Sequence, residues 1–152
     1  MTRTMRGFTM VEMIITIVVG AILLSIALRG LGGTMSSLAV DNARQSFASL
    51  QAQARTYAIE RGELTRLGVD PAGDTAWVQA AGGTRVSFLD FMEERGVDVQ
   101  TSTAGIITLC MNPRGFADVD CNSFGANTVD VEFRQGGQSS TITILPLGQL
   151  SW

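Results

Sequence analysis

One long apolar run near the amino terminus constrains this chain more than any other feature. Of residues 8–28, 16 of 21 are apolar. As an α-helix this run would be about 31 Å long, close to the thickness of the hydrocarbon core of a bilayer. Arg3 and Arg6 precede it, and no acidic residue lies among the first seven. The positive-inside rule then predicts a single membrane pass with the amino terminus in the cytoplasm and the bulk of the chain outside it.

One ionisable residue, Glu12, lies inside the apolar run near its start. A charged side chain costs roughly 2.5 to 3.5 kcal/mol near the bilayer centre, and less toward the end of a span. A tolerated carboxylate at the membrane interface is therefore one interpretation of Glu12. The run is also longer than the apolar core of a secretory signal, and Arg29 and glycines follow it, so cleavage on its far side is not expected.

A second interpretation comes from the residues around Glu12. The segment Arg6-Gly7-Phe8-Thr9-Met10-Val11-Glu12, followed by apolar residues, resembles the class III signal of type IV pilins and type II secretion pseudopilins. In that family a prepilin peptidase cuts after the glycine. The resemblance implies cleavage between Gly7 and Phe8, N-methylation of Phe8, and a docking role for the Glu12 carboxylate toward the free amino terminus of a neighbouring Phe8 in a fibre.

The composition argues against an enzyme. The chain has no His, and all eleven of its basic residues are Arg, which removes Ser/His and Cys/His nucleophile pairs, lysine Schiff bases and phosphate-loop lysines. Two cysteines cannot form a four-thiolate zinc site. The oxygen-rich stretch 118–132 fails the EF-hand calcium template, since Ser123 and Val129 occupy its glycine and bidentate acid positions. No cofactor and no metal are expected, although calcium at 118–132 stays an open question.

The stretch 36–61 shows the period of an amphipathic helix. Its apolar stripe, with spacings of three and four, is Val40, Ala43, Phe47, Leu50, Ala54 and Tyr57. The opposite face is expected to hold Asp41, Arg44, Gln45, Gln51, Gln53 and Arg55, and Gly62 is a plausible stop. Before this stretch, Gly30, Gly32 and Gly33 lower the helix propensity, so a kink or a frayed turn is expected near 30–33.

The remainder of the chain has the pattern of short strands separated by Gly, Asn and Pro turns. The expected strands are 63–69, 75–81, 85–89, 105–111, 128–134 and 140–146, and 89–95 is expected to form a short helical turn. Six strands in this length favour antiparallel sheets, in a sandwich-like arrangement behind the long helix. The segments LQAQARTYAIERG (50–62), ITLCMNPRG (107–115) and ITILPLGQL (142–150) resemble the GspH/FimT branch of minor pseudopilins and minor pilins.

The two cysteines, Cys110 and Cys121, fall in the part expected outside the cytoplasm, where an even count favours a disulfide. Two free thiols are the alternative. The DNA-binding members of the branch carry a Gly-Arg-x-Arg signature, and the residues here are Gly148-Gln149-Leu150-Ser151, which lack both arginines. After residue 29 the net charge is 8 − 13 = −5, which disfavours nucleic acid as a partner. A small basic face of Arg55, Arg61 and Arg66 is an option, but a solvated surface is the simpler expectation.

These observations predict an α+β, pilin-like fold in which a long amino-terminal helix packs on a carboxy-terminal antiparallel β-sheet or sandwich domain. The expected divisions are a leader peptide (1–7), a transmembrane and fibre-core half of the helix (8–29), a periplasmic amphipathic half (30–62) and a β-rich globular domain (63–152). The expected location is the bacterial inner membrane, with one pass, a cytoplasmic amino terminus and a periplasmic carboxy-terminal domain, before movement into a periplasmic fibre.

The resemblance implies a structural rather than enzymatic function. The first expectation is a minor pseudopilin of a type II secretion system. The alternative is a minor type IV pilin of a pilus for DNA uptake, adhesion or twitching, and a third option is an ordinary membrane-anchored periplasmic protein. The implied partners are other pilin-like subunits through the amino-terminal helix, the prepilin peptidase and the inner-membrane assembly platform, with secreted cargo as a further candidate.

Overall fold

The structure is a computed structural model that describes residues 9–152, with the exception of the side chains of 27–32. The expected leader, its cleavage point after Gly7 and the methylated Phe8 lie outside the described residues. The chain divides into two compact units, Met1–Met35 and Ser36–Trp152. Helix α1 (Met10–Arg61) runs through both units. It contains every described residue of the first unit except Thr9, and it forms the first part of the second unit.

Helix α1 begins directly after Thr9, whose side chain caps it. Thr9 Oγ1 accepts a hydrogen bond from the Glu12 backbone N–H at 3.2 Å, and the Thr9 carbonyl accepts one from Met13 N at 3.2 Å, as expected of an N-cap residue. The backbone stays helical through Gly30, Gly32 and Gly33, so the expected frayed turn is wrong, and the alternative of a kink stays a prediction. Glycine weakens a helix but, unlike proline, keeps its N–H, so the backbone hydrogen-bond ladder can continue.

The second half of α1 buries the predicted stripe. Val40, Ala43, Phe47, Leu50 and Ala54 are at most 2% exposed. The stripe continues to Ala58, which is fully buried, while the predicted position Tyr57 is half-buried. At the end of the helix Gly62 adopts a positive φ of 64°, a conformation that glycine enters without a steric cost. The amphipathic interpretation of this half is therefore correct, with a small shift at its end.

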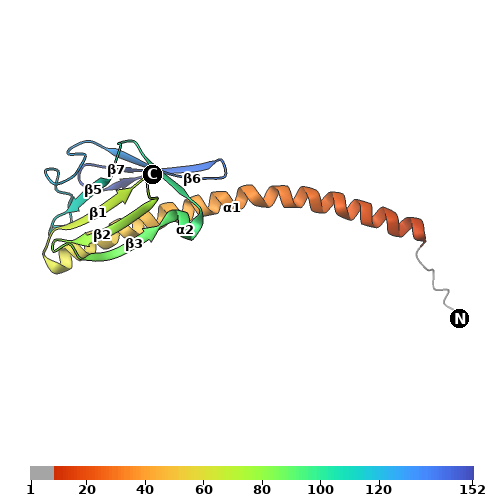
Figure 1. Cartoon of the computed structure of the whole chain (residues 1–152), viewed down its shortest axis with the longest axis horizontal. Helices are drawn as coiled ribbons and strands as arrows, with labels where there is room; N and C mark the ends of the chain where they lie inside the picture. The colour runs from red at the N-terminus through yellow and green to blue at the C-terminus, as the bar shows by residue number, and fades with distance from the viewer. Residues whose placement is uncertain (1–8) are drawn as a thin grey trace. The chain divides into compact units, whose positions relative to one another are not determined.

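Two antiparallel four-stranded sheets make up the rest of the second unit (Figure 1). The first has the order β3-β2-β1-β5, with bounds β1 Thr65–Asp70, β2 Thr75–Ala80, β3 Arg85–Asp90 and β5 Ile107–Met111. The second has the order β4-β6-β7-β8, with bounds β4 Asp98–Thr101, β6 Val129–Gln135, β7 Gln138–Ile144 and β8 Leu150–Ser151. Helix α2 (Phe91–Arg95) connects β3 to β4.

Each of the six predicted strands is present, with ends displaced by at most two residues. The predicted helical turn is α2, which starts at Phe91 because Asp90 caps it: the Asp90 carboxylate accepts a hydrogen bond from Glu93 N at 2.8 Å. Strands β4 and β8 were not predicted. They have four and two residues, and strands this short carry too little alternation to be recognised.

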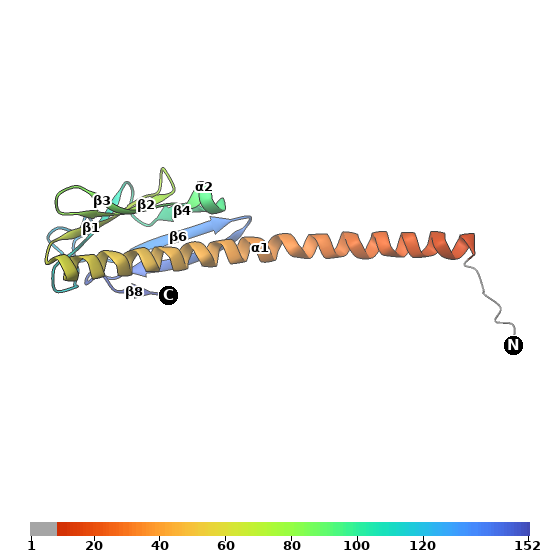
Figure 2. The same ribbon diagram turned by 90° about the horizontal axis from the view of Figure 1, so that it is seen from below.

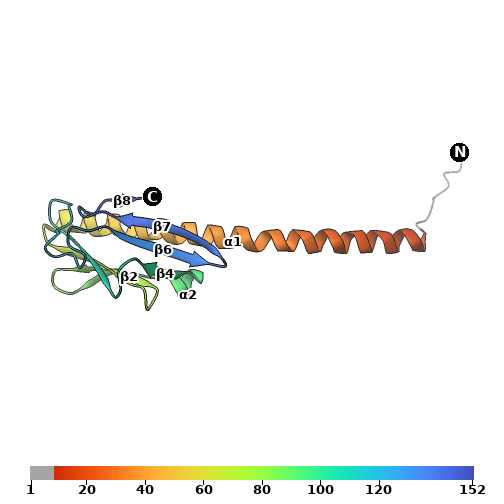
Figure 3. The same cartoon turned by 90° about the horizontal axis from the view of Figure 1, so that it is seen from above.

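The inner faces of both sheets and the apolar stripe of α1 share one hydrophobic core. Figure 2 shows β1, β2 and β3 of the first sheet and β6 and β8 of the second lying along the second half of α1, and Figure 3 shows the β6–β7 hairpin from the other side. Phe133 of β6 joins the layers, with ring centroids 5.9 Å from Phe47 of α1 and 5.3 Å from Phe91 of α2. The fold is thus α+β, with a long amino-terminal helix packed on antiparallel sheets, as predicted.

Candidate functional site

Glu12 lies in the first turn of α1, and its side chain is exposed. Its backbone N–H donates a hydrogen bond to Thr9 Oγ1. The spacing Thr9-x-x-Glu12 is that of a capping box. A carboxylate at this position also interacts favourably with the positive end of the helix dipole. The position of Glu12 thus favours the helix start electrostatically. Its expected docking role stays a prediction, because a single chain does not test it. The role of Thr9 was missed, although Thr-x-x-Glu before an apolar run signals it.

The first unit exposes apolar side chains on every side of α1. Large apolar residues between positions 10 and 26 are each at least 49% exposed, namely Met10, Val11, Met13, Ile14, Ile15, Ile17, Val18, Val19, Ile22, Leu23, Leu24 and Ile26. A helix that is apolar all round is stable only when it is covered by other helices or by lipid. These residues are therefore the first candidate functional surface.

Among the residues whose side chains the structure describes, which leave out 1–8 and 27–32, no helix meets the length and hydropathy required to cross a membrane. The predicted span, 8–28, has both of its ends outside that set.

The cysteine pair closes a loop beside β5. The structure joins Cys110 to Cys121 by a disulfide, with a Cα–Cα distance of 5.8 Å. The loop bonds to the free edge of β5: Thr108 N donates to Ser123 Oγ at 2.8 Å, and Cys110 N donates to Asn122 Oδ1 at 2.9 Å. Asp118 N in turn donates to the Cys110 carbonyl at 2.8 Å. The loop therefore satisfies backbone groups that an edge strand would otherwise present to other chains.

Two polar residues of α1 hold the loops that lie over it. Gln51 was predicted on the solvent face, but it is only 7% exposed, and its Nε2 donates to the Gly148 carbonyl at 2.5 Å. Arg55 Nε donates to the Gly115 carbonyl at 2.6 Å. The prediction for Gln51 is wrong because the pattern of α1 carries no information on a loop almost a hundred residues later.

The three arginines of the expected basic face have different surroundings. Arg55 is engaged by the Gly115 carbonyl, Arg61 lies over the Tyr57 ring at 5.6 Å, and Arg66 is exposed on β1. In the described part of the chain, no three acidic, Cys or His side chains gather so as to hold a metal ion.

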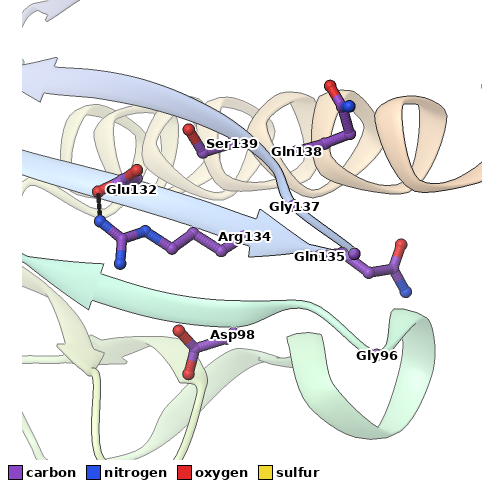
Figure 4. A pocket seen from close by; sticks show the side chains of 9 residues that line it. Gly96, Asp98, Glu132, Arg134, Gln135, Gly137, Gln138 and Ser139 are labelled. Carbon is purple, nitrogen blue, oxygen red and sulfur yellow. Dashed lines mark hydrogen bonds and ion pairs between the residues drawn. The ribbon is translucent and has the colours of Figure 1, made fainter. Parts of the chain in front are cut away.

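An open hollow of about 570 Å³ lies on the outer face of the second sheet (Figure 4). Its lining residues are Gly96, Asp98, Glu132, Arg134, Gln135, Gly136, Gly137, Gln138 and Ser139. Arg134 Nη2 donates to Glu132 Oε2 at 2.5 Å. This hydrogen bond is the main reason that the pKa of Glu132 is lowered and the pKa of Arg134 is raised. Both groups are thus charged near neutral pH, and the hollow suits a polar or cationic group of a partner.

Comparisons with known proteins agree with this geometry. Residues 2–28 match the prokaryotic N-terminal methylation motif, which includes Gly7, Phe8 and Glu12. No curated protein matches the chain. A crystal structure of the Pseudomonas aeruginosa (strain PAO1) type IV minor pilin FimU is similar, with a TM-score of 0.54, 12% identity, and coverage of 74% of this chain and 86% of that one. A second crystal form of FimU gives a TM-score of 0.51, 13% identity, and coverage of 73% and 90%. The chain therefore has a prokaryotic N-terminal methylation motif at its amino terminus and a fold similar to that of the type IV minor pilin FimU.

Proposed function

We propose that this chain is a non-enzymatic, minor subunit of a type IV pilin-like fibre. One observation carries the proposal: the methylation motif overlaps the start of a helix, and the apolar side chains of this part of the helix are exposed on all sides. A fibre core built from such helices covers these side chains, and so does lipid before assembly. The FimU structures, which are those of a type IV minor pilin, support the same assignment through the fold.

The proposed cycle starts in the bacterial inner membrane. The run 8–28 holds the chain there, with Arg3 and Arg6 on the cytoplasmic side and the second unit in the periplasm. Prepilin peptidase cleaves between Gly7 and Phe8, and Phe8 is methylated. The assembly platform then moves the subunit into a fibre, where the Glu12 carboxylate meets the amino terminus of a neighbouring Phe8. The other pilin-like subunits are its main partners.

Two fibres are candidates. A pseudopilus of type II secretion is favoured by the acidic charge of the second unit and by the missing arginines at Gly148-Gln149-Leu150-Ser151. A type IV pilus is favoured by the likeness to the minor pilin FimU. Deletion of the gene, followed by assays of secreted protein and of twitching, adhesion and DNA uptake, separates them. Loss of secretion alone assigns the pseudopilus, and loss of a surface activity alone assigns the pilus.

The docking role of Glu12 is tested by two substitutions. Glu12→Gln keeps the size of the side chain and removes its charge, and Glu12→Ala removes both. Both variants should be processed and inserted normally but enter the fibre poorly. Breaking a buried ion pair costs about 3 to 5 kcal/mol, which corresponds to a fall in incorporation of roughly a hundredfold or more. The fraction of subunit in sheared fibres, measured by immunoblot, gives the answer.

Thr9→Ala is the matched control, because it removes the helix cap and leaves the Glu12 charge in place. A lost cap costs about 1 kcal/mol, so this variant should assemble far better than Glu12→Gln. Wild-type incorporation of Glu12→Gln contradicts the docking role.

A further inference from the structure

The outer face of the first sheet carries an aromatic surface. Trp77 of β2 lies against Gly68 of β1 so closely that a Cβ on Gly68 would collide with the indole ring. Phe88 of β3 is paired with Trp77 and is 45% exposed. Arg85 lies over both rings, with its guanidinium carbon 5.9 Å from the Trp77 centroid and 4.9 Å from the Phe88 centroid. Trp77, Phe88 and Arg85 form what we call the aromatic platform.

The positive charge beside these rings has no carboxylate partner. Arg66 and Arg85 flank Gln79 in one row across the sheet, and both side chains are exposed. Among the described residues, the ion pairs are Arg44–Asp41 and Arg134–Glu132, so neither arginine of this row is neutralised. The nearest acids of β1 and β3, Asp70 and Asp90, stand at the opposite end of the strands, where each accepts a hydrogen bond from local backbone.

The outer face of the second sheet has the opposite charge. Asp98, Asp130 and Glu132 lie on this face, and Arg134 is already paired with Glu132. Besides the hollow shown in Figure 4, a second one of about 260 Å³ includes Asp130 and Glu132 in its lining. We call this the acidic face. The acidic face carries these two hollows, whereas the aromatic platform carries two rings and the guanidinium of Arg85.

We propose that the aromatic platform of one copy of this chain docks on the acidic face of a second copy. Opposite charges on the two faces favour the encounter and set its orientation, and Trp, Phe and Arg are residue types enriched where proteins bind one another. Both sheets turn their inner faces to one shared core, so the two outer faces are different surfaces. A contact between different surfaces is heterologous, so each copy contributes a different face to it. The inference rests on the proposed fibre function and names one contact, between two copies of this chain that are neighbours.

A single-lysine cross-link tests the contact with little background, because the chain contains no Lys, and a link through the amino-terminal amine is distinguished by the peptide that it joins. Arg85→Lys keeps the charge and supplies an amine. Carbodiimide then joins this amine to a carboxylate in direct contact, forming an amide while the reagent takes up the water that is lost. The full chain, in detergent, is prepared as an equal mixture of ¹⁵N-labelled and unlabelled copies, so that links between copies are recognised by mass spectrometry. Arg114→Lys, in the exposed loop after β5, is the control.

The expected result is a link between copies from the amine introduced by Arg85→Lys to Asp98, Asp130 or Glu132. When Asp130→Arg and Glu132→Arg are added, the link to Asp98, whose carboxylate is unchanged, should fall by at least about tenfold. Arg114→Lys should give none of these links. The proposal is overturned if Arg85→Lys gives no link between copies, or if the links of the two lysine variants are equal. The intact mass of the same sample reports leader removal separately, so failure of this contact is distinguishable from failure of the fibre proposal.

Discussion

Gln51 shows how one side chain can tie distant parts of this fold together. Its amide lies at the edge of the helix stripe, next to Leu50, and reaches the Gly148 carbonyl between β7 and β8. Because the position is buried, water cannot replace the bond. A buried acceptor left without a donor costs about 1 to 3 kcal/mol.

Gln51→Glu should therefore destabilise the second unit by at least this amount, since a carboxylate cannot donate to Gly148 and also brings a charge into a buried site. Thermal or urea unfolding followed by circular dichroism measures the change. Gln53→Glu makes the same substitution at an exposed position of the same helix and should change the stability by less than about 0.5 kcal/mol. Equal effects at the two positions would refute the role of Gln51.

Gly68 is a second residue with a specific spatial role, because the Trp77 ring packs directly against it. Gly68→Ala should displace the indole and destabilise the unit by roughly 1 to 3 kcal/mol, the usual cost of overpacking. Gly82→Ala is the matched control, because nothing lies within 4 Å of the added Cβ. Unfolding curves and the fluorescence of Trp77, measured in a Trp152→Phe background, check both effects. An unchanged emission spectrum in Gly68→Ala would contradict the described position of Trp77.

At the scale of elements, most of the fold follows from local pattern, and the parts that do not are set by contacts between distant residues. Alternation and turn residues were enough for six strands, and the stripe from Val40 to Ala54 was enough for the packed half of α1. The two missed strands, β4 and β8, exist because β6 and β7 pair with them. Local pattern also does not encode the strand order of either sheet, because pairing partners are far apart in the chain.

The candidate sites also differ in whether a local sequence pattern predicts them. Glu12 belongs to a contiguous motif, so the sequence alone names it as a candidate, and its docking role stays a prediction. The aromatic platform combines Trp77 and Arg85 from different strands, and the acidic face combines Asp98 with residues more than thirty positions later. Neither grouping has a local signature, which explains why only the structure reveals it.

The disulfide loop belongs to the scale of elements because it covers a whole strand edge. We expect that the Cys110→Ser/Cys121→Ser variant loses about 3 kcal/mol by the loop-entropy estimate, and that the amides of residues 108 and 110 exchange faster with solvent, since their acceptors Ser123 and Asn122 sit on the loop. Hydrogen exchange measures the amides. The amide of Leu67, within the core of β1, is the internal reference. Two thiols that react with an alkylating reagent in the native, unreduced protein would contradict the bond.

At the scale of the whole molecule, the chain combines two units with opposite surface properties. The second unit buries its apolar residues in one core, whereas the first exposes them along its helix. Such a pair is unstable as a freely dissolved monomer, since the exposed helix would associate nonspecifically. A covered state, in lipid or in a fibre, would account for both units at once, and it is the state that we propose for this chain.

The most direct test of this account is the intact mass of the full chain after expression with and without a prepilin peptidase. With the peptidase, the mass should fall by that of residues 1–7 and rise by one methyl group, and sequencing should place the methyl group on Phe8. Without the peptidase, the chain should keep all 152 residues apart from removal of the initiating Met. An unchanged mass in the presence of an active peptidase that processes a known pilin in the same cells would contradict the central claim.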